Sequence, residues 1–422
     1  MFSKCKEIDI VVGIPSYNEA DNIAFVARQL SLGLSKHFPS HSAAIINVDN
    51  NSSDGTREAF LGAETGKILK KYISTERGIV GKGNNFRNLL IEVERLKAKA
   101  IVVVDADLLS ITPEWVKALA TPILEGHDYV TPIYSRNEYD GTITNHITYP
   151  LIYSIFKADI RQPIGGDFAF SPKMARYWTG MAWEKNTRQY GIDIFMTTSA
   201  ILNGFRVCQA ALGSKVHKPS TPKLGLMFTQ VISTLFANIS NFKNIWLNGS
   251  LKKDCPIHGE FNYEDPQPLS VDYKSIKQES INGFSSMDNL LSSIMHSPHY
   301  HATRKMYLTM RWNIGSKLWT KILYDFIFAY ETSENKEDVV EALKPLYFAR
   351  TASFYRQTLD MTHQEAEEKI LGQAKQFHKC RGYLFKKYGN YSGSKFRPAC
   401  RPVRTDSSGR ADRGSRFTVR ER

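Results

Sequence analysis

Residues 101–108 read IVVVDADL, and this stretch decides the fold that we predict for the chain. Four β-branched apolar residues in a row are typical of a strand buried on both faces, as in a parallel sheet. Asp105 and Asp107 follow at the point where that strand should end. Because open α/β sheets bind ligands beyond the carboxyl ends of their strands, these two carboxylates mark a predicted site.

The spacing of the two carboxylates indicates what they could bind. One carboxylate can ligate a divalent cation while the other accepts hydrogen bonds from sugar or ribose hydroxyls. The cation then neutralises a diphosphate, which carboxylates alone would repel. A D-x-D triplet occurs by chance in many chains, but its position after 101–104 favours a nucleotide site over a solvated turn.

Strand-like and helix-like segments alternate around this stretch. The predicted strands are 8–14, 43–48, 70–74, 101–104 and 128–134. Helical spacing of apolar residues occurs at 20–38, 86–100 and 146–156. The alternation predicts an α/β fold with a mostly parallel sheet and flanking helices.

The other predicted strand ends also carry groups suited to a nucleotide. The turn after the first strand offers an aromatic face and polar groups to a base through Pro15, Tyr17, Asn18 and Glu19. Asp49 ends the second strand, where it can accept from an imide N–H or a ribose hydroxyl. Lys82 lies between two glycines just before a helix, a place suited to a phosphate or the edge of a nucleotide. A plain turn with a solvated lysine is the competing interpretation.

The composition is that of an ordinary globular protein. Of the 422 residues, 42% are hydrophobic and 23% charged, which excludes collagen, coiled coil and a mostly disordered chain. The most apolar stretch, 224–239, is interrupted by polar residues and predicts a buried helix, not a membrane span. Five scattered cysteines and the lack of a signal-peptide core indicate reduced thiols and a cytoplasmic location.

The net charge of +13 is unevenly distributed. Residues 395–422 contain nine Lys/Arg and three Asp/Glu with little apolar periodicity, which predicts a disordered basic tail. A nucleic-acid-binding arm is an alternative, but composition alone does not favour it, and we expect no nucleic-acid partner. The remaining positive charge suits an enzyme that handles phosphates without requiring one.

Four regions follow from these patterns. We predict a catalytic α/β domain over 1–250, a polar connector over 251–286, a helical region over 287–389 and the disordered tail over 390–422. The aromatic residues of the helical region predict a core or a dimer face, and we expect a homodimer.

The motifs together resemble those of a known family. IDIVVGIPSYNEADNI, VDNNSSDGT, GKGNN and VVVDADL, in this order, look like a GT-A nucleotide-sugar glycosyltransferase of family 2 and its relatives. The stretches 143–172, 191–201 and 213–219 are similar to glucosyl-3-phosphoglycerate synthases of glycosyltransferase family 81 and to glucosylglycerate synthases. A dinucleotide-binding domain is disfavoured, because GIPSYN stands where G-x-G-x-x-G is required.

The resemblance implies a role for several donor-site residues. Asp105 and Ala106 would contact the nucleotide, and Asp107 would ligate Mg²⁺ or Mn²⁺. His217 would be a further metal ligand, although a lone histidine without this resemblance would be a surface or core residue. The donor would be an NDP-glucose with either UDP or GDP.

The resemblance also implies an acceptor site. The guanidinium of Arg161 and the backbone of Gly165 and Gly166 would hold a small anion, with contacts added by Thr144 and Asn145. Asp193 would be the general base of an inverting enzyme, or would orient the acceptor or sugar in a retaining one; helix capping is the structural alternative.

The resulting prediction is a retaining, metal-dependent transferase. It would move glucose, or a similar hexose, to D-glycerate or 3-phosphoglycerate, which makes a compatible solute of the glucosylglycerate type. The alternatives are an inverting family 2 enzyme acting on a polysaccharide or polyprenyl phosphate, and a nucleotide-sugar-binding protein without turnover. No zinc site is expected, because Cys255 and His258 are two ligands without a second pair at a convincing spacing.

Overall fold

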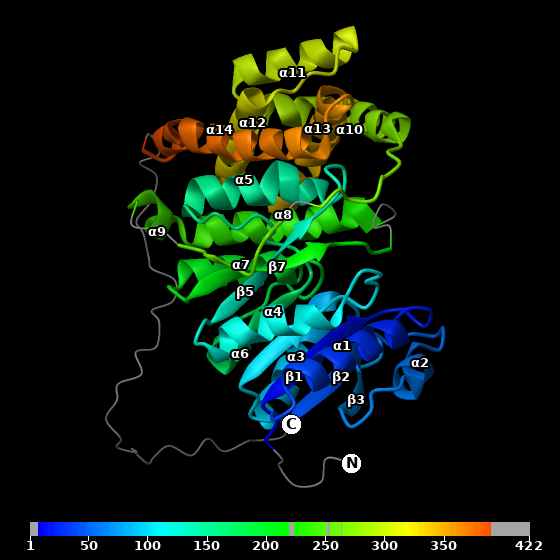
Figure 1. The fold of residues 1–422 in the computed structure, drawn as a ribbon. Coiled ribbons are helices and arrows are strands. Elements are labelled where there is room, and N and C mark those ends of the chain that lie inside the picture. Colours follow the sequence, from blue (N-terminus) through cyan, green and yellow to red (C-terminus); the bar gives the residue numbers. More distant parts are fainter. Residues whose placement is uncertain (1–6, 219–222, 250, 252–253, 263, 390–422) are drawn as a thin grey trace, which may run out of the picture.

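The computed structural model describes residues 7–218, 223–249, 251, 254–262 and 264–389. The predicted tail, Cys5 and Cys400 therefore lie outside the described residues. In Figure 1 the first half of the chain forms a sheet with helices on both faces, and the C-terminal helices stack in further layers on one side.

The sheet has eight strands in the order β3-β2-β1-β4-β6-β5-β7-β8. Neighbouring strands are parallel except for β6, which runs antiparallel to β4 and β5. The strands are β1 Ile10–Ser16, β2 Ala43–Asp49, β3 Leu69–Ser74, β4 Ala100–Val103, β5 Tyr129–Ser135, β6 Phe168–Phe170, β7 Val207–Ser214 and β8 Ile257–His258. The strand order reverses between β1 and β4, and the space beyond their carboxyl ends is where such sheets bind ligands.

Two apolar layers enclose the sheet. On one face, α1 (Ile23–His37) packs against α4 (Pro113–Leu124). On the other face lie α3 (Lys82–Arg95), α6 (Pro172–Thr179) and α7 (Ile192–Leu202). The short α2 (Thr56–Gly62) follows β2. β1, β2 and β4 are buried along their whole length, which explains why they appear in the sequence as continuous apolar runs.

The predicted aromatic helix is present, but it is irregular. It consists of η1 (Thr144–Thr148), α5 (Tyr149–Leu151) and η2 (Ile152–Phe156), and η1 and η2 are π-type turns. Pro150 lacks the N–H that would bond to the carbonyl of His146 in a regular helix. That carbonyl instead accepts from Trp319 Nε1 at 2.7 Å, so a tryptophan of the C-terminal region satisfies the broken turn.

The C-terminal region is helical, as predicted. Its helices are α10 Tyr273–Ile294, α11 Ser297–Thr309, α12 Ser316–Thr332, α13 Lys336–Thr358 and α14 His363–Gly389. The helix α10 begins inside the segment predicted as a connector, so the expected boundary at 286/287 falls within a helix. One continuous apolar core joins these helices to α3, α7 and η2, so the helical region is packed against the α/β part of the chain and not separated from it.

The apolar stretch 224–239 forms most of α8 (Leu224–Asn241), followed by α9 (Lys243–Leu247). As predicted, α8 is buried, with α7 and α13 packed against it. In the part of the chain that the structure describes, no helix combines the length and the apolar character needed to cross a membrane. The predicted architecture is thus confirmed: a mostly parallel α/β sheet with flanking helices and a helical C-terminal region.

Candidate active site

Three residues from separate parts of the chain meet beyond the carboxyl ends of β1 and β4. Lys82 begins α3, Asp105 follows β4, and Asp193 lies in the first turn of α7. The Lys82 Nζ atom lies 2.8 Å from Asp105 Oδ1 and 3.2 Å from Asp193 Oδ2. Residues that the sequence singled out for different reasons therefore form one ion-pair cluster.

The three groups of this cluster differ in how their surroundings shift their pKa. Burial works against the charge of Lys82, but Asp105 and Asp193 outweigh it and raise the pKa of the ammonium. Burial also works against the charge of Asp105, yet Lys82 and Lys215 hold the pKa of this carboxyl below its usual value. At Asp193 burial dominates and raises the pKa. Its Oδ1 atom is buried and makes no hydrogen bond within the described residues, so this oxygen can accept a hydrogen bond from a ligand.

A second lysine holds Asp105 from the other side. The Lys215 Nζ atom lies 3.3 Å from Asp105 Oδ2 and 2.8 Å from Asp167 Oδ2, and it donates to the carbonyl of Gly165 at 2.7 Å. Asp167 also accepts from the backbone N–H of Asp105 at 2.9 Å and from the hydroxyl of Tyr134. The position of Asp105 is thus fixed by several polar contacts.

The Gly165–Gly166 pair lies directly against this strand end. Gly166 has a φ of 88°, which is in the left-handed region, and a Cβ atom on it would lie 1.9 Å from Asp105 Oδ2. A Cβ atom on Gly165 would lie 2.3 Å from Pro132 Cγ. Glycine is therefore required for the loop to pass so close to Asp105. Its contact with an acceptor stays a prediction.

We expect Gly166→Ala to displace Asp105 and to weaken donor binding. The left-handed alanine costs about 1–3 kcal/mol of folding stability. A lost hydrogen bond to a charged group costs about 1.5–3 kcal/mol, so donor affinity should fall about tenfold to a hundredfold. Calorimetry with UDP-glucose or GDP-glucose and Mn²⁺ measures it. Gly372→Ala is the control, because a Cβ atom there meets nothing within 4 Å. Wild-type donor affinity in a folded Gly166→Ala protein would contradict the packing argument.

Asp107 is the candidate metal ligand. No hydrogen bond to its carboxylate occurs among the described residues, and burial together with the charge of Asp105 raises its pKa. Glu19 lies nearby: burial and the charge of Asp107 raise its pKa, although Lys218 Nζ lies 2.7 Å from its Oε2 atom. A carboxylate left unpaired among other carboxylates fits a divalent cation that keeps further ligands from water and phosphate.

The backbone places His217 next to the D-x-D turn that carries Asp107. Leu108 and His217 form an antiparallel β-bridge, and the Leu109 N–H donates to the carbonyl of Val216 at 2.8 Å. The two residues predicted as metal ligands, His217 and Asp107, are therefore carried by adjoining segments.

The ring of His217 already has partners on both nitrogens. Its Nε2 atom lies 3.1 Å from Arg136 Nη2 and 3.2 Å from Asp140 Oδ2, and its Nδ1 atom lies 2.7 Å from the carbonyl oxygen of Lys218. If His217 ligates a cation through Nε2, that atom must leave Arg136 and Asp140. The fit of His217 to a metal is therefore conditional on a local rearrangement, whereas Asp107 needs none.

The loop after β1 is organised for a ligand by backbone bonds. Asn18 has a φ of 55°, its N–H donates to Ser52 Oγ at 2.7 Å, and Tyr17 is left 53% exposed. Pro15 lies within β1 and is buried. An exposed ring next to the strand end is suited to stacking on a base.

Asn22 links this loop to the D-x-D turn. Its Nδ2 atom donates to the carbonyls of Ala106 and Leu108 at 2.8 and 2.9 Å. Asn22 was not among the predicted residues, because a single asparagine before a helix is more typical of a cap.

Asp49 is more enclosed than the sequence suggests. Its two carboxylate oxygens accept from Ser16 Oγ, from the N–H and Oγ of Ser52, and from the hydroxyl of Tyr72, at 2.6–3.0 Å. The residue is fully buried. A contact between Asp49 and a base or ribose stays a prediction, and it would require one of these four hydrogen bonds to break.

Arg161 is bound differently from the expectation. Its Nε and Nη2 atoms lie 2.6 and 2.8 Å from the two carboxylate oxygens of Glu367 on α14, and Nη2 also donates to Asn145 Oδ1 at 2.9 Å. The ring of Tyr149 lies 5.2 Å from the guanidinium carbon. The planar edge that we expected to grip an acceptor carboxylate is thus occupied by a protein carboxylate.

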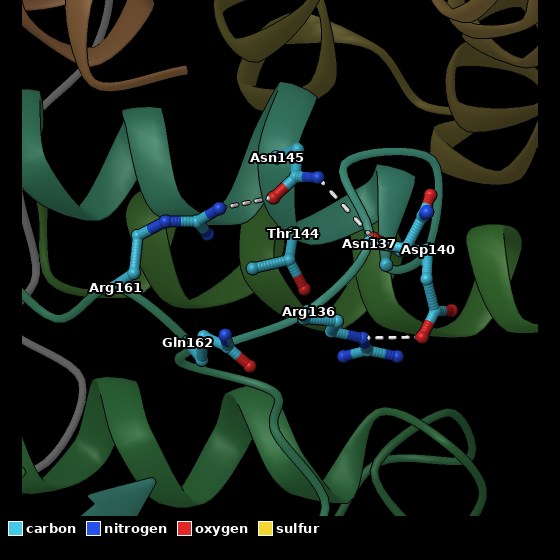
Figure 2. A pocket seen from close by; sticks show the side chains of 8 residues that line it. Arg136, Asn137, Asp140, Thr144, Asn145, Arg161 and Gln162 are labelled. Carbon is cyan, nitrogen blue, oxygen red and sulfur yellow. Dashed lines mark hydrogen bonds and ion pairs between the residues drawn. The ribbon is translucent and has the colours of Figure 1, made fainter. Parts of the chain in front are cut away.

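Three of the predicted acceptor residues nevertheless line one small pocket. Figure 2 shows Arg161 bonded to Asn145, Thr144 below Asn145 in this view, and Arg136 paired to Asp140. The open space is about 10 Å³, the size of a single water molecule. Gly165 and Gly166 do not line it but lie on the Asp105 side.

Several residues of the site escaped the sequence analysis. Asp167 carried a signal, since an acidic residue directly after two glycines near a strand is unusual. Arg136, Asp140 and Glu367 carried none, because their importance arises only from pairing across the fold.

The fold and the cluster define an α/β protein with a D-x-D turn and a buried ion-pair cluster at the carboxyl ends of its strands. Within this class, residues 11–180 match the family model described as glycosyl transferase family 2. This confirms the predicted resemblance for that region: the chain carries a glycosyltransferase domain of the GT-A fold. The matched region includes Lys82, Asp105 and Asp107, whereas Asp193 and His217 lie beyond it.

Solved structures of glucosyl-3-phosphoglycerate synthase from Mycobacterium tuberculosis are similar to this chain. The complex with Mg²⁺ and UDP has a TM-score of 0.46 at 24% identity and covers 55% of this chain and 79% of that chain. The complex with Mn²⁺, UDP and glucosyl-3-phosphoglycerate has a TM-score of 0.45 at 22% identity and covers 55% and 80%. No curated protein matches the chain.

Proposed function

We propose that this protein transfers glucose, or a similar hexose, from a nucleoside diphosphate sugar to D-glycerate or 3-phosphoglycerate with retention of anomeric configuration. The cluster of Lys82, Asp105 and Asp193 beside the unpaired Asp107 is the observation that carries the proposal. It supplies a cation, an ionised carboxylate and a metal ligand at one strand end, which a diphosphate leaving group requires.

On the donor side, each group has a defined task. Asp105 is ionised and accepts from sugar or ribose hydroxyls, and Tyr17 stacks on the base. Lys82 holds Asp105 and Asp193 in place and contributes positive charge near the transferred sugar. Asp107 would hold Mg²⁺ or Mn²⁺, and His217 would join it once its ring has turned away from Arg136. The ion would stabilise the charge that develops on the diphosphate.

The transfer needs no external base, because the leaving group can take the proton of the acceptor. The acceptor hydroxyl oxygen forms a bond to the anomeric carbon as the bond from that carbon to the diphosphate oxygen breaks. The departing oxygen takes the acceptor proton, and the new bond lies on the same face as the old one. Asp193, with its buried Oδ1 atom unbonded, would accept a hydrogen bond from the sugar or acceptor and orient it.

The pocket in Figure 2 is the proposed entry for the acceptor. It adjoins the donor cluster through the contact between Arg136 and His217, and it must widen to admit an anion. Its two guanidinium groups, Arg136 and Arg161, are paired to Asp140 and Glu367. This charge balance favours D-glycerate, which has one negative charge, over phosphoglycerate, which would need cations that are not already paired.

An inverting transferase is the second candidate, and one observation favours it. The raised pKa and unbonded oxygen of Asp193 are properties of a general base that deprotonates an acceptor. The configuration of the product decides between the two mechanisms.

The test is a product assay on the full chain. UDP-glucose, GDP-glucose and the corresponding mannose donors are each mixed with D-glycerate or 3-phosphoglycerate in the presence of Mg²⁺ or Mn²⁺. We expect release of the nucleoside diphosphate only with an acceptor, and an α-linked product identified from its anomeric proton coupling by NMR. A β-linked product would establish the inverting mechanism. Donor binding without turnover on any acceptor would support a binding protein instead.

A further inference from the structure

A second cluster of metal-ligating side chains lies at the opposite edge of the sheet from the candidate active site. His127 precedes β5, Cys208 is the second residue of β7, and His258 ends β8. The potential ligand atoms of these three residues all lie within 4.8 Å of one another. The active-site residues lie beyond the carboxyl ends of the strands, whereas these residues are near the amino ends of β5 and β7.

The backbone fixes the three residues independently of one another. Cys208 is paired with Val130 of β5, and His258 with Ala210 of β7. The His127 N–H donates to the carbonyl of Pro122 at 2.9 Å. Two of the three residues are thus held by strand pairing, and His127 is held in the turn before β5 by its backbone hydrogen bond.

The two imidazole rings are arranged to share a cation. Their centroids lie 4.8 Å apart at an interplanar angle of 83°. The Nδ1 atom of His127 is buried and makes no hydrogen bond within the described residues.

The sulfur atom selects the kind of metal. A thiol with two imidazoles suits Zn²⁺ far better than Mg²⁺ or Ca²⁺, which prefer oxygen. Ligand atoms around a tetrahedral Zn²⁺ ion lie about 3.3–3.8 Å apart, so side-chain movements of about 1 Å close the observed cluster around the ion. Burial raises the pKa of the Cys208 thiol to about 12, so an ion that binds the thiolate must displace a proton.

We propose that His127, Cys208 and His258 form a structural Zn²⁺ site that ties the β8 segment to the sheet. The expectation of no zinc site rested on the lack of a second pair of ligands along the sequence, and in the fold His127 and Cys208 lie beside His258. Cys255 is three residues before His258 and close enough to influence Cys208, so it is the nearest candidate for the fourth position. Closed four-coordinate sites are typical of structural zinc.

The site is tested on the full chain under reducing conditions, after removal of metal by a chelator. Co²⁺ is added as a spectroscopic substitute for Zn²⁺. We expect a thiolate-to-Co²⁺ absorption band, displaced by one equivalent of Zn²⁺. None of the cysteines that the structure describes lies at the candidate active site, so we do not expect this band from metal bound at Asp107. The same titration with Zn²⁺ should raise the Tm, because an ion that binds only the folded chain stabilises it.

Matched variants separate this site from adventitious binding. His258→Gln should weaken Zn²⁺ binding by about tenfold or more, as the loss of even an indirect supporting contact does elsewhere. His301→Gln and Cys380→Ser remove a histidine and a cysteine elsewhere in the chain and should leave the affinity unchanged. Cys208→Ser should abolish the band. Cys208 is buried, so its variant could fail to fold, and in that case His258→Gln is the variant that decides. No thiolate band in the wild type, or equal Zn²⁺ affinity in His258→Gln, would overturn the proposal.

Discussion

Replacing Asp107 with alanine should abolish sugar transfer and leave the fold unchanged. The carboxylate has no hydrogen bond to any described residue, so its removal leaves no partner unsatisfied. Without it, the cation that neutralises the diphosphate loses its protein ligand. Several kcal/mol of charge stabilisation are at stake, which at about 1.4 kcal/mol per tenfold corresponds to a rate loss of about a hundredfold to ten-thousandfold.

The measurement is kcat for nucleotide release at saturating Mn²⁺, together with the Tm of each protein. Asp360→Ala is the control, since it removes an exposed aspartate from the turn after α13. His217→Ala should reduce activity less, because water can replace an imidazole ligand. A chelator should have the same effect on the wild type as the Asp107 substitution. Full activity of the wild type in the chelator would contradict the metal assignment for both residues.

The grouping of Lys82 and Asp105 at the strand ends could be predicted because these residues carry local signals. Lys82 stands at a helix start, and Asp105 and Asp107 follow an apolar strand. In a parallel sheet such positions converge at one edge whatever the details of packing. That geometry explains why Lys82 and Asp105 meet, although 23 positions separate them in the chain.

Pairings between distant segments could not be predicted in the same way. Asp49 ends its strand as expected, yet its hydrogen bonds to Ser16 and Tyr72 depend on how three strands align. The partner of Arg161 is 206 positions away on a helix whose own pattern indicates only an amphipathic surface. The zinc ligands illustrate the same limit, because each lies on a different strand or strand end.

The pairing of Arg161 with Glu367 leads to the second large expected effect, which is on stability. Both side chains are buried, with relative exposures of 9% and 6%, and the two-pronged contact joins the loop before β6 to α14. Arg161→Ala would leave the Glu367 carboxylate buried without its main partner. Breaking a buried ion pair in this way costs about 3–5 kcal/mol, so the free energy of unfolding should fall by that amount.

Urea unfolding of Arg161→Ala, followed by far-UV circular dichroism, measures this loss. The matched variant is the double substitution Arg161→Met with Glu367→Leu, which removes both charges and keeps apolar volume at the junction. Since replacing both members of a buried pair is often nearly neutral, the double variant should recover most of the stability. Wild-type stability of Arg161→Ala would show that the pair does not hold α14 in place.

The double variant also separates the structural role of Arg161 from the acceptor role proposed for it. If the guanidinium contacts the acceptor after Glu367 moves aside, the KM for D-glycerate should rise about tenfold to a hundredfold in a protein that is stable again. Donor affinity should stay at the wild-type level, because Lys82 and Asp105 do not touch this pair. An unchanged KM would assign Arg161 to the fold alone and leave Arg136, at the other end of the same pocket, as the cation that the acceptor meets.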